Sequence, residues 1–308
     1  EIPLRLVGSE MCIRDRTYTV EEATFDSFKG IDIALFAGGS ISKDFAPHAV
    51  KAGAVVIDNS SAFRMDPEVP LVVPEVNPQA ILKHKGIIAN PNCSTIIMVM
   101  ALKPIYDLAK IKRVIVSTYQ AVSGAGKEGI DELDAQVRDH SEGREMTANT
   151  LPSASAEKHY PIAFNLIPQI DVFCDNLYTK EEMKMVNETK KIMEDYEMRI
   201  TATTIRVPVY RSHSESVNIE LEKEVDLGAM REALAKFPGV TVQDDPSKQE
   251  YPMPLYTSEK DDVYVGRLRR DESCEKSYNM WVVGDQIRKG AALNTLQIAE
   301  TMIKNGWI

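Results

Sequence analysis

The sequence predicts an α/β protein in two parts, a parallel-sheet domain followed by an α+β domain with a mixed sheet. Short apolar runs separated by helix or loop occupy residues 31–89, a pattern typical of a parallel sheet covered on both faces. Longer segments that alternate between apolar and polar residues follow them. Such alternation is typical of an open antiparallel or mixed sheet. With 308 residues, 44% of them hydrophobic, the chain can bury a core in each part.

The first part contains strands joined by helix and loop. Residues 31–36 form an apolar run that leads into Gly38-Gly39-Ser40, a tight turn, and residues 42–51 follow as a helix. Three further runs end at Asp, Asn, Pro or Ser, at residues 54–57, 71–73 and 86–89. This succession of strand, glycine turn and helix predicts an α/β nucleotide-binding domain.

The second part begins with a segment that is apolar on all sides, residues 94–108, which indicates a buried helix. Residues 114–116 and 203–221 alternate and are predicted strands. A helix is predicted over residues 179–198, because Thr179 and Glu182 form a capping box at its start. Its buried side is expected to hold its apolar residues, Met183, Val186 and Met193. A last amphipathic helix is predicted over residues 290–303.

Composition excludes several classes of function. The net charge of −10 argues against a nucleic-acid or anionic-membrane partner, so an acidic ligand must meet a local group of Arg and Lys. No apolar run approaches the roughly 20 residues of a transmembrane helix. The cysteines lack CxxC spacing, which argues against a metal site or a disulfide framework and favours the cytoplasm. They are Cys12, Cys93, Cys174 and Cys274.

The first residues differ from the rest of the chain. Residues 1–16 lack the apolar region of a signal peptide and show neither helix nor strand periodicity. We expect this segment to be foreign to the protein. The alternative is an irregular native tail.

One cysteine has the setting of a nucleophile. Pro91 stiffens the turn in Asn90-Pro91-Asn92, and Cys93 then stands at or beside the first turn of the predicted buried helix. Free main-chain N–H groups and the helix dipole at that position favour a thiolate, and the N–H groups could also hold an oxyanion. An isolated cysteine is more often a small buried apolar residue.

A second candidate site lies in the segment TTIRVPVYRSHSESVN. Arg206 and His213 are seven residues apart, so an unbroken strand would place them on opposite faces. Pro208 and the Arg211-Ser212 pair indicate a bend that could bring both into one cleft. Arg206 could then clamp a carboxylate, and His213 could serve as a general acid–base. Taken singly, a surface ion pair and an ordinary loop histidine are the alternatives.

A third candidate is the segment from Gln120 to Lys127, QAVSGAGK, which follows a strand. The helix after it carries a buried stripe that includes Ile130, Leu133 and Val137. This arrangement could bring N–H groups to a ligand, although the GxxxxGK[ST] spacing of a P-loop is absent. A plain tight turn remains the alternative.

Together these segments resemble the aspartate-β-semialdehyde dehydrogenase family. The similarity runs from residue 17 to residue 308, and its motifs occur in the family order. They are the NPNCSTI nucleophile motif, the SGAGKEG loop, the RVPV…HSESVN segment, the SSAFR turn at Ser60 to Arg64, and the WVV-x-D-x-x-x-KGAA run from Trp281. The resemblance implies NADPH-dependent reduction of L-aspartyl 4-phosphate to L-aspartate 4-semialdehyde through a cysteine thioester. It places the enzyme in lysine, threonine and methionine biosynthesis.

The resemblance also implies roles for individual residues. Cys93 is the nucleophile, His213 the acid–base, and Gln120 orients the substrate. Substrate contacts fall to Arg206 for the α-carboxylate, Glu181 for the α-amino group, and Lys184 and Arg64 for the phosphate. The NADP contacts are Gly38, Gly39, Ser40, Ser123, Gly124 and Gln286. No metal is implied.

The implied domains are residues 17–92 with 286–308 for NADP binding, and residues 93–285 for catalysis and dimerisation, in a homodimer or homotetramer. Three features depart from the family. Its opening strand, GxxGxxG turn, helix and basic segment are not found here, so we expect an incomplete Rossmann-like domain that lacks its first βα unit. The turn at residues 36–39 is one residue shorter, and Gln286 stands where Asn is commoner. Preference for NADP over NAD is left open.

Two other functions were weighed. N-acetyl-γ-glutamyl-phosphate reductase uses related chemistry, but it would need no acidic residue for a free amino group, so Glu181 favours the aspartyl substrate. An inactive truncated homologue is the second alternative. A homologue that had lost its chemistry would be expected to lose Cys93 or His213, and both are present.

Overall fold

The computed structural model describes residues 8, 10–13 and 16–308. Its internal contacts divide the chain into two compact units. Unit 1 runs to Pro74 and also includes Pro78–Pro91 and Thr295–Ile308, whereas unit 2 comprises Glu75–Asn77 and Asn92–Asn294. Residues 286–294 thus group with unit 2, although the sequence assigned them to the first domain.

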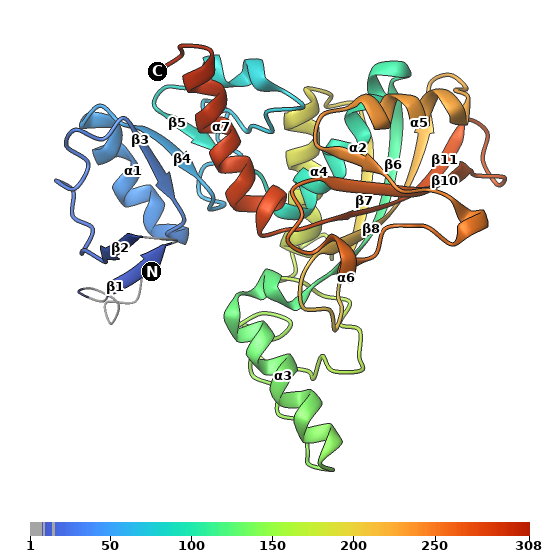
Figure 1. The fold of residues 1–308 in the computed structure, drawn as a ribbon, viewed down its shortest axis with the longest axis horizontal. Coiled ribbons are helices and arrows are strands. Elements are labelled where there is room, and N and C mark those ends of the chain that lie inside the picture. Colours follow the sequence, from blue (N-terminus) through green and yellow to red (C-terminus); the bar gives the residue numbers. More distant parts are fainter. Residues whose placement is uncertain (1–7, 9, 14–15) are drawn as a thin grey trace. The chain divides into compact units, whose positions relative to one another are not determined.

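Unit 1 contains a parallel sheet of three strands in the order β3-β4-β5 (Figure 1). The strands are Ile33–Phe36, Val55–Asp58 and Ile87–Ala89. The 3₁₀ turn Gly39–Ile41 and helix α1, Ser42–Lys51, connect β3 to β4. An antiparallel pair, β1 (Glu10–Ile13) and β2 (Arg16–Thr19), precedes them. The predicted parallel sheet is therefore confirmed.

The core of unit 1 has two faces. Small residues of β3, α1, β4 and the turn before β4 form one cluster, with Ala34, Ala46, Ala49, Ala54 and Val56 buried. On the other, residues of helix α7 (Leu293–Lys304) pack against the strands, among them Ile298 and Met302 with Ile57 and Ile88.

The prediction of a strand at residues 71–73 is wrong. Only Leu71 forms a bridge, with Ala89, although Val72 and Val73 are fully buried. Proline, which cannot donate a main-chain hydrogen bond, stands on both sides of the run, at positions 70 and 74. Burial explains the apolar run, and the prolines explain why it does not extend the ladder.

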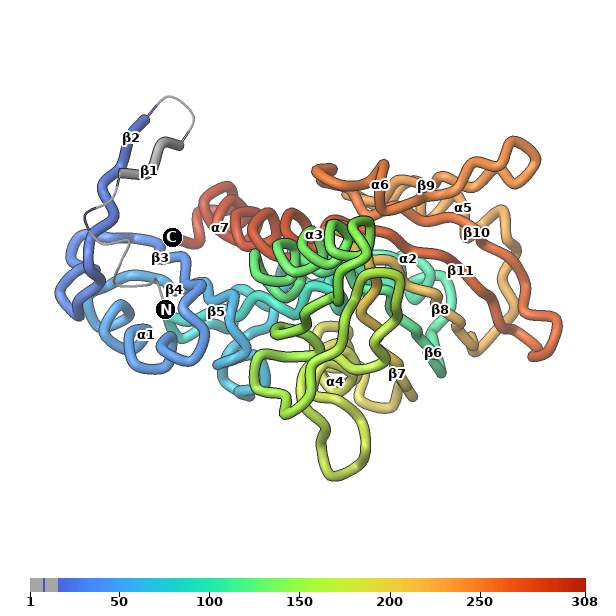
Figure 2. The backbone as a smooth tube through the Cα atoms, turned by 90° about the horizontal axis from the view of Figure 1, so that it is seen from below, coloured from blue at the N-terminus to red at the C-terminus, as the bar shows by residue number. Residues whose placement is uncertain are grey.

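Unit 2 is built on a mixed sheet of six strands in the order β7-β6-β8-β11-β10-β9 (Figure 2). The predicted mixed sheet is confirmed, because β6 pairs with β7 in parallel and with β8 antiparallel. Its elements are, in chain order, α2 (Cys93–Leu108), β6 (Ile111–Gln120), η4 (Val122–Ala125), α3 (Lys127–Ser141), α4 (Lys180–Met193), β7 (Arg199–Arg206), β8 (His213–Leu221), α5 (Leu227–Lys236), β9 (Val240–Val242), η5 (Pro246–Lys248), α6 (Pro254–Thr257), β10 (Val263–Arg270), β11 (Ser277–Gly284) and the π-helix η6 (Arg288–Ala292).

The sheet topology gathers three candidate residues at one edge. β6 and β7 are parallel, so their last residues, Gln120 and Arg206, are direct neighbours. β8 runs antiparallel to β6 and begins at the same edge with His213. The chain between Arg206 and His213 leaves the sheet, which is the predicted bend between them.

The helices of unit 2 correct two predictions about burial. Helix α2 is buried along nearly its whole length, as predicted. Helix α4 ends at Met193, and its buried face carries three carboxylates beside the apolar Met185 and Ile192. The carboxylates are those of Glu181, Glu182 and Glu188, whereas the apolar residues expected on this face are only half-buried. In α3, Leu133 is buried but Val137 is 39% exposed, so the predicted stripe is narrower.

Candidate active site

Cys93 is the first residue of α2, at the position that the sequence predicts. Asn92 caps the helix in an extended conformation, and its side-chain oxygen accepts a hydrogen bond from the Thr95 N–H at 3.1 Å. Helix α2 presents its N-terminus at Cys93, where the partial positive charge of the dipole stabilises a negative sulfur. Gly290 of the π-helix packs closely against Cys93, since a Cβ added to Gly290 would lie 3.0 Å from the Cys93 Cβ.

His213 is fully buried beside this cysteine. Its Nε2 lies 3.6 Å from the Cys93 Sγ, and its Nδ1 accepts a hydrogen bond from the main-chain N–H of Ala121 at 3.1 Å. Burial, together with the nearby Arg206 guanidinium, lowers the pKa of His213 well below its ordinary 6.5. The ring is therefore neutral at physiological pH.

Arg206 is 3% exposed, so the alternative of a surface ion pair is wrong. Its Nη1 donates to the Ala121 carbonyl at 2.7 Å. Its Nε is buried and has no hydrogen-bond partner in the described part of the chain. Burial lowers the pKa of Arg206, and the nearby Glu181 and Cys93 oppose this shift. A buried guanidinium with a donor to spare is suited to binding an anionic ligand.

Glu181 joins this group from helix α4. Its Oε1 accepts from Gln120 Nε2 at 3.3 Å, and its Oε2 accepts from Lys184 at 3.1 Å. Burial raises the pKa of Glu181, but Lys184, Asn92 and Arg206 outweigh burial and hold it below the ordinary value. The carboxylate is thus ionised. Lys184, one turn further on, also pairs with Asp171 at 3.0 Å.

Asn92 and the acidic face of α4 are linked in a way that sequence reasoning missed. The side-chain Nδ2 of Asn92 donates to Glu181 at 2.8 Å, and its main-chain N–H donates to Glu188 at 2.6 Å. Glu182 accepts from the Thr204 N–H at 3.0 Å. These hydrogen bonds explain why three carboxylates can be buried on one helix face. The preference for Asn at helix N-caps could have identified Asn92 from the sequence. No local sequence pattern marks Glu188 as part of the site.

The glycine turn after β6 covers the other side of the site. A Cβ on Gly124 would lie 2.6 Å from Arg206 Nη1 and 3.1 Å from His213 Cε1. A side chain at this position would require Arg206 to shift. Ser123 accepts a hydrogen bond from Gln286, whose Oε1 accepts from the Ser212 N–H at 2.9 Å. Gln286 thus fixes the turn against the segment that leads into β8.

Glu215 is a further buried group that the sequence did not single out. It lies two residues after His213 on β8 and is completely inaccessible to solvent. Neither of its carboxyl oxygens has a hydrogen-bond partner among the residues the structure describes. Burial raises the pKa of Glu215 well above 4.5, so the group is held as a neutral acid.

Four predicted ligand residues belong to unit 1. Gly38, Gly39 and Ser40 form the turn after β3, and Gly39 has φ +62° with nothing within 4 Å of the place of a Cβ. Arg64 ends the turn after β4, where its Nη2 donates to the Asn59 carbonyl at 2.8 Å. Unit 2 brings the others together: Cys93, Gln120, Ser123, Gly124, Glu181, Lys184, Arg206, His213 and Gln286.

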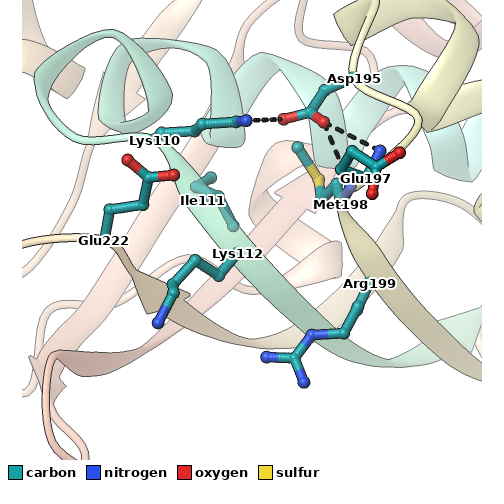
Figure 3. Close-up of a pocket in the computed structure, with 8 residues that line it drawn as sticks. All are labelled: Lys110, Ile111, Lys112, Asp195, Glu197, Met198, Arg199 and Glu222. Atoms are coloured by element: carbon teal, nitrogen blue, oxygen red, sulfur yellow. Dashed lines mark hydrogen bonds and ion pairs between the residues drawn. The ribbon is translucent and has the colours of Figure 1, made fainter.

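A cavity of about 260 Å³ lies at the other end of β6 and β7 (Figure 3). The cations around it are paired. Lys110 lies 3.5 Å from Asp195, and Lys112 and Arg199 lie 3.2 and 3.4 Å from Glu220. No spare cation marks it as a site for an acidic ligand. In the described ranges we find no cluster of side chains suited to a metal and no helix long and apolar enough to cross a membrane.

Known families match both parts of the chain. The NAD binding domain of semialdehyde dehydrogenases matches residues 7–84, and their dimerisation domain matches residues 102–289. An aspartate-semialdehyde dehydrogenase of Aquifex aeolicus is 56% identical over 308 residues, covering 99% of this chain and 89% of the relative. The chain belongs to the aspartate-semialdehyde dehydrogenase family. It is therefore an oxidoreductase with a nucleotide-binding domain, and N-acetyl-γ-glutamyl-phosphate reductase is not supported.

Solved aspartate semialdehyde dehydrogenases share the fold. Enzyme II from Vibrio cholerae, solved in complex with ASA, is 44% identical with a TM-score of 0.92, covering 98% of this chain and 88% of that one. The enzyme from Candida albicans, solved with NADP, has a TM-score of 0.69 at 24% identity. The match covers 90% of this chain and 78% of the Candida chain. At that identity it supports the fold alone.

Proposed function

We propose that this chain reduces L-aspartyl 4-phosphate to L-aspartate 4-semialdehyde with NADPH, through a thioester on Cys93. The observation that carries the proposal is the pairing of Cys93 with His213 at 3.6 Å, beside a buried Arg206 with a spare donor. The solved Vibrio cholerae relative with bound ASA supports the same substrate.

Substrate recognition follows from the local charges. Arg206 is the partner for the α-carboxylate, because its guanidinium offers parallel donors. Glu181 is ionised and is the partner for the α-amino group. Lys184 and Arg64 provide positive charge for the phosphate, and they are the local cations that an acidic ligand needs in a chain with a net charge of −10. Gln120 contacts Glu181 and orients the carbon to be attacked.

The chemistry on the chain has two stages. The Cys93 thiolate attacks the acyl carbon, a C–S bond forms, the C–O bond to phosphate breaks, and phosphate leaves. When bound, NADPH supplies the hydride that reduces the thioester carbon. The resulting alkoxide collapses, the C–S bond breaks and the aldehyde departs. Holding the acyl carbon against sulfur supplies much of the rate through proximity.

The turn in unit 1 fits the cofactor. It lies at the carboxyl end of β3, the edge of a parallel sheet at which nucleotides bind. The positive φ of Gly39 and the open space beside it leave the main chain accessible to a phosphate. Gly38, Gly39 and Ser40 are the residues we assign to NADP there, with Ser123, Gly124 and Gln286 from unit 2.

We further infer assembly as a homodimer or homotetramer in the cytoplasm through the dimerisation domain. A row of side chains crosses four strands on one sheet face: Thr203, Ser117, Ser216 and Trp281 are register neighbours. Thr203 and Ser216 are exposed, so this face is accessible to a second copy.

The thioester is the species to test. Incubation with aspartate semialdehyde and NADP, without phosphate, should leave an aspartyl group on the peptide that contains Cys93, detected by mass spectrometry. A Cys174→Ser protein should acquire the same label, and a Cys93→Ser protein should acquire none. A label on another cysteine would contradict the assignment of the nucleophile.

A further inference from the structure

Lys184 lies between two carboxylates of the site. Its ammonium donates to Glu181 Oε2 at 3.1 Å and to Asp171 Oδ2 at 3.0 Å. Burial lowers the pKa of Lys184, but these two carboxylates outweigh burial and raise it, so the ammonium is charged. A lysine has three N–H donors. A phosphate that binds at Lys184 must therefore share the cation with two negative groups.

Glu181 has other partners in the site, whereas Asp171 is held by its own loop. Glu181 Oε1 accepts from Asn92 Nδ2 at 2.8 Å. Asp171 Oδ1 accepts from the N–H of Val172 at 2.8 Å, which leaves Oδ2 directed at Lys184. The residue has φ +67°, a left-handed conformation that Asp tolerates better than most side chains. The loop thus fixes the Asp171 carboxylate on Lys184 without any contribution from a substrate.

The loop that carries Asp171 is attached to the site on both sides. Before it, Ile167 and Arg206 exchange two main-chain hydrogen bonds, at 2.9 and 3.1 Å. After it, the Val172 carbonyl accepts from the N–H of the first residue of α4 at 2.9 Å. The position of Asp171 is therefore set by β7 and α4, the elements that carry Arg206 and Lys184. The side chains of Lys184 and Asp171 are 26% and 34% exposed, so a dissolved anion can reach the pair.

An anion that binds at Lys184 is repelled by Asp171. The ammonium is 3.0 Å from the Asp171 oxygen, so a phosphate oxygen hydrogen-bonded to the same ammonium lies about 5 Å from the carboxylate. Like charges at that separation repel each other near a protein surface, and the solvent around this half-exposed pair reduces the repulsion without cancelling it. Asp171 thus weakens the binding of any phosphate that Lys184 holds.

We propose, on the basis of the proposed function, that Asp171 sets the affinity of the phosphate subsite. While the subsite is empty, Asp171 holds Lys184 in place as its counter-ion. Once the thioester on Cys93 has formed, the same carboxylate repels the phosphate that has just left. The phosphate therefore departs readily and does not remain to reverse the acyl transfer. Asp171 acts through Lys184 and is a positioning residue.

Binding of inorganic phosphate tests the proposal without any turnover. Its dissociation constant can be measured on the full chain from the broadening of the ³¹P signal. We expect Asp171→Asn to lower this constant by about three- to tenfold, because one nearby negative charge is removed. Asp175→Asn, an exposed position in the same loop, makes the same change of net charge and should alter the constant by less than about twofold.

The direction of the change decides between two roles for Asp171. An aspartate that only oriented Lys184 would weaken phosphate binding when it was removed. An unchanged or raised dissociation constant in Asp171→Asn, or an equal gain of affinity in Asp175→Asn, would therefore overturn the proposal.

Lys184→Met separates a failure of this inference from a failure of the proposed function. The variant should lose most of its affinity for inorganic phosphate, because methionine fills similar space without the charge. If phosphate bound to it as to the wild type, Lys184 would not be the phosphate partner, and the inference would fall with that role. If Lys184→Met lost phosphate while Asp171→Asn left binding unchanged, the role of Lys184 would stand and only that of Asp171 would be wrong.

Discussion

The two ends of strands β6 and β7 both carry ionisable side chains, which are exposed at one end and buried at the other. At the Ile111 and Arg199 end, Lys112 and Arg199 are 46% and 66% exposed and share Glu220. At the other end, about 30 Å away along β6, Arg206 is buried with a donor to spare. Exposed ion pairs contribute about 0–1 kcal/mol. The comparison teaches that burial with incomplete hydrogen bonding, and not charge, distinguishes the candidate site.

The largest expected effect is at the nucleophile. Cys93→Ser should lower kcat by several orders of magnitude with folding intact, because serine is a far weaker nucleophile without its own activating base. Steady-state kinetics would measure it, with Cys274→Ser, an exposed cysteine, as the control. A Cys93→Ser enzyme that kept more than about a tenth of wild-type kcat would refute the assignment.

The two ends of β7 allow a matched pair of substitutions. Arg206→Lys should raise KM for the substrate by roughly 10-fold to 100-fold, or about 1–3 kcal/mol, since a single charge replaces a planar fork. Arg199→Lys, at the first residue of the same strand, should change KM less than about twofold. If both variants bound substrate normally, the carboxylate partner would have to be sought elsewhere.

Gly124→Ala tests how tightly the turn covers the site. The glycine is required by space and not by backbone conformation, because a Cβ would lie 2.6 Å from Arg206 Nη1. A misplacement of about 1 Å can cost about 100-fold, so the smaller shift needed here should lower kcat/KM by about tenfold. The unfolding temperature should stay near that of the wild type. Unchanged kinetics would mean that Arg206 and His213 can move without consequence.

The remaining effect is on stability and not on turnover, and it involves Glu215. Below pH 4.5 the group is protonated in both folded and unfolded chains. As pH rises above that value, the unfolded chain releases the proton and the folded chain keeps it. The free energy of unfolding then falls by about 1.4 kcal/mol per pH unit until the raised folded pKa is reached.

Glu215→Gln should remove this loss. Its stability relative to the wild type should therefore increase between about pH 5 and pH 8, as measured by urea denaturation. Glu222→Gln, an exposed position just after β8, is the matched control for the substitution itself. A pH-independent difference for Glu215→Gln would mean that the buried acid is ionised in the folded chain.

Much of the fold follows from the sequence, because local patterns and burial agree in most elements. The apolar helix at Cys93 and the capping box at Thr179 are examples. The order of the motifs also assigns Cys93, His213 and Arg206 to one site. Only the parallel and antiparallel pairing around β6 explains why Arg206 and His213 lie close together.

The buried carboxylates of α4 could not be predicted from the sequence, for a physical reason. An apolar stripe on α4 was predicted because carboxylates are expected to face water. Glu182 and Glu188 are buried there because N–H groups of Thr204 and Asn92, far away in the sequence, satisfy them. Tertiary partners of this kind leave no local pattern. The hydrogen bonds of the Ala121 main chain to His213 and Arg206 are hidden for the same reason, since any residue but proline supplies that N–H.

The hydrogen bonds of Asn92 have a consequence for how changes at this site combine. Asn92 contacts Glu181 through its side chain and Glu188 through its main chain, so the start of α2 is held to helix α4, which carries the proposed amino-group partner Glu181. Substitutions at these three positions should therefore not be independent. In a double-mutant cycle, Asn92→Ala and Glu181→Gln should show a coupling energy of about 0.5–3 kcal/mol. Removing either member already breaks the side-chain hydrogen bond between them, so the second removal has little left to undo.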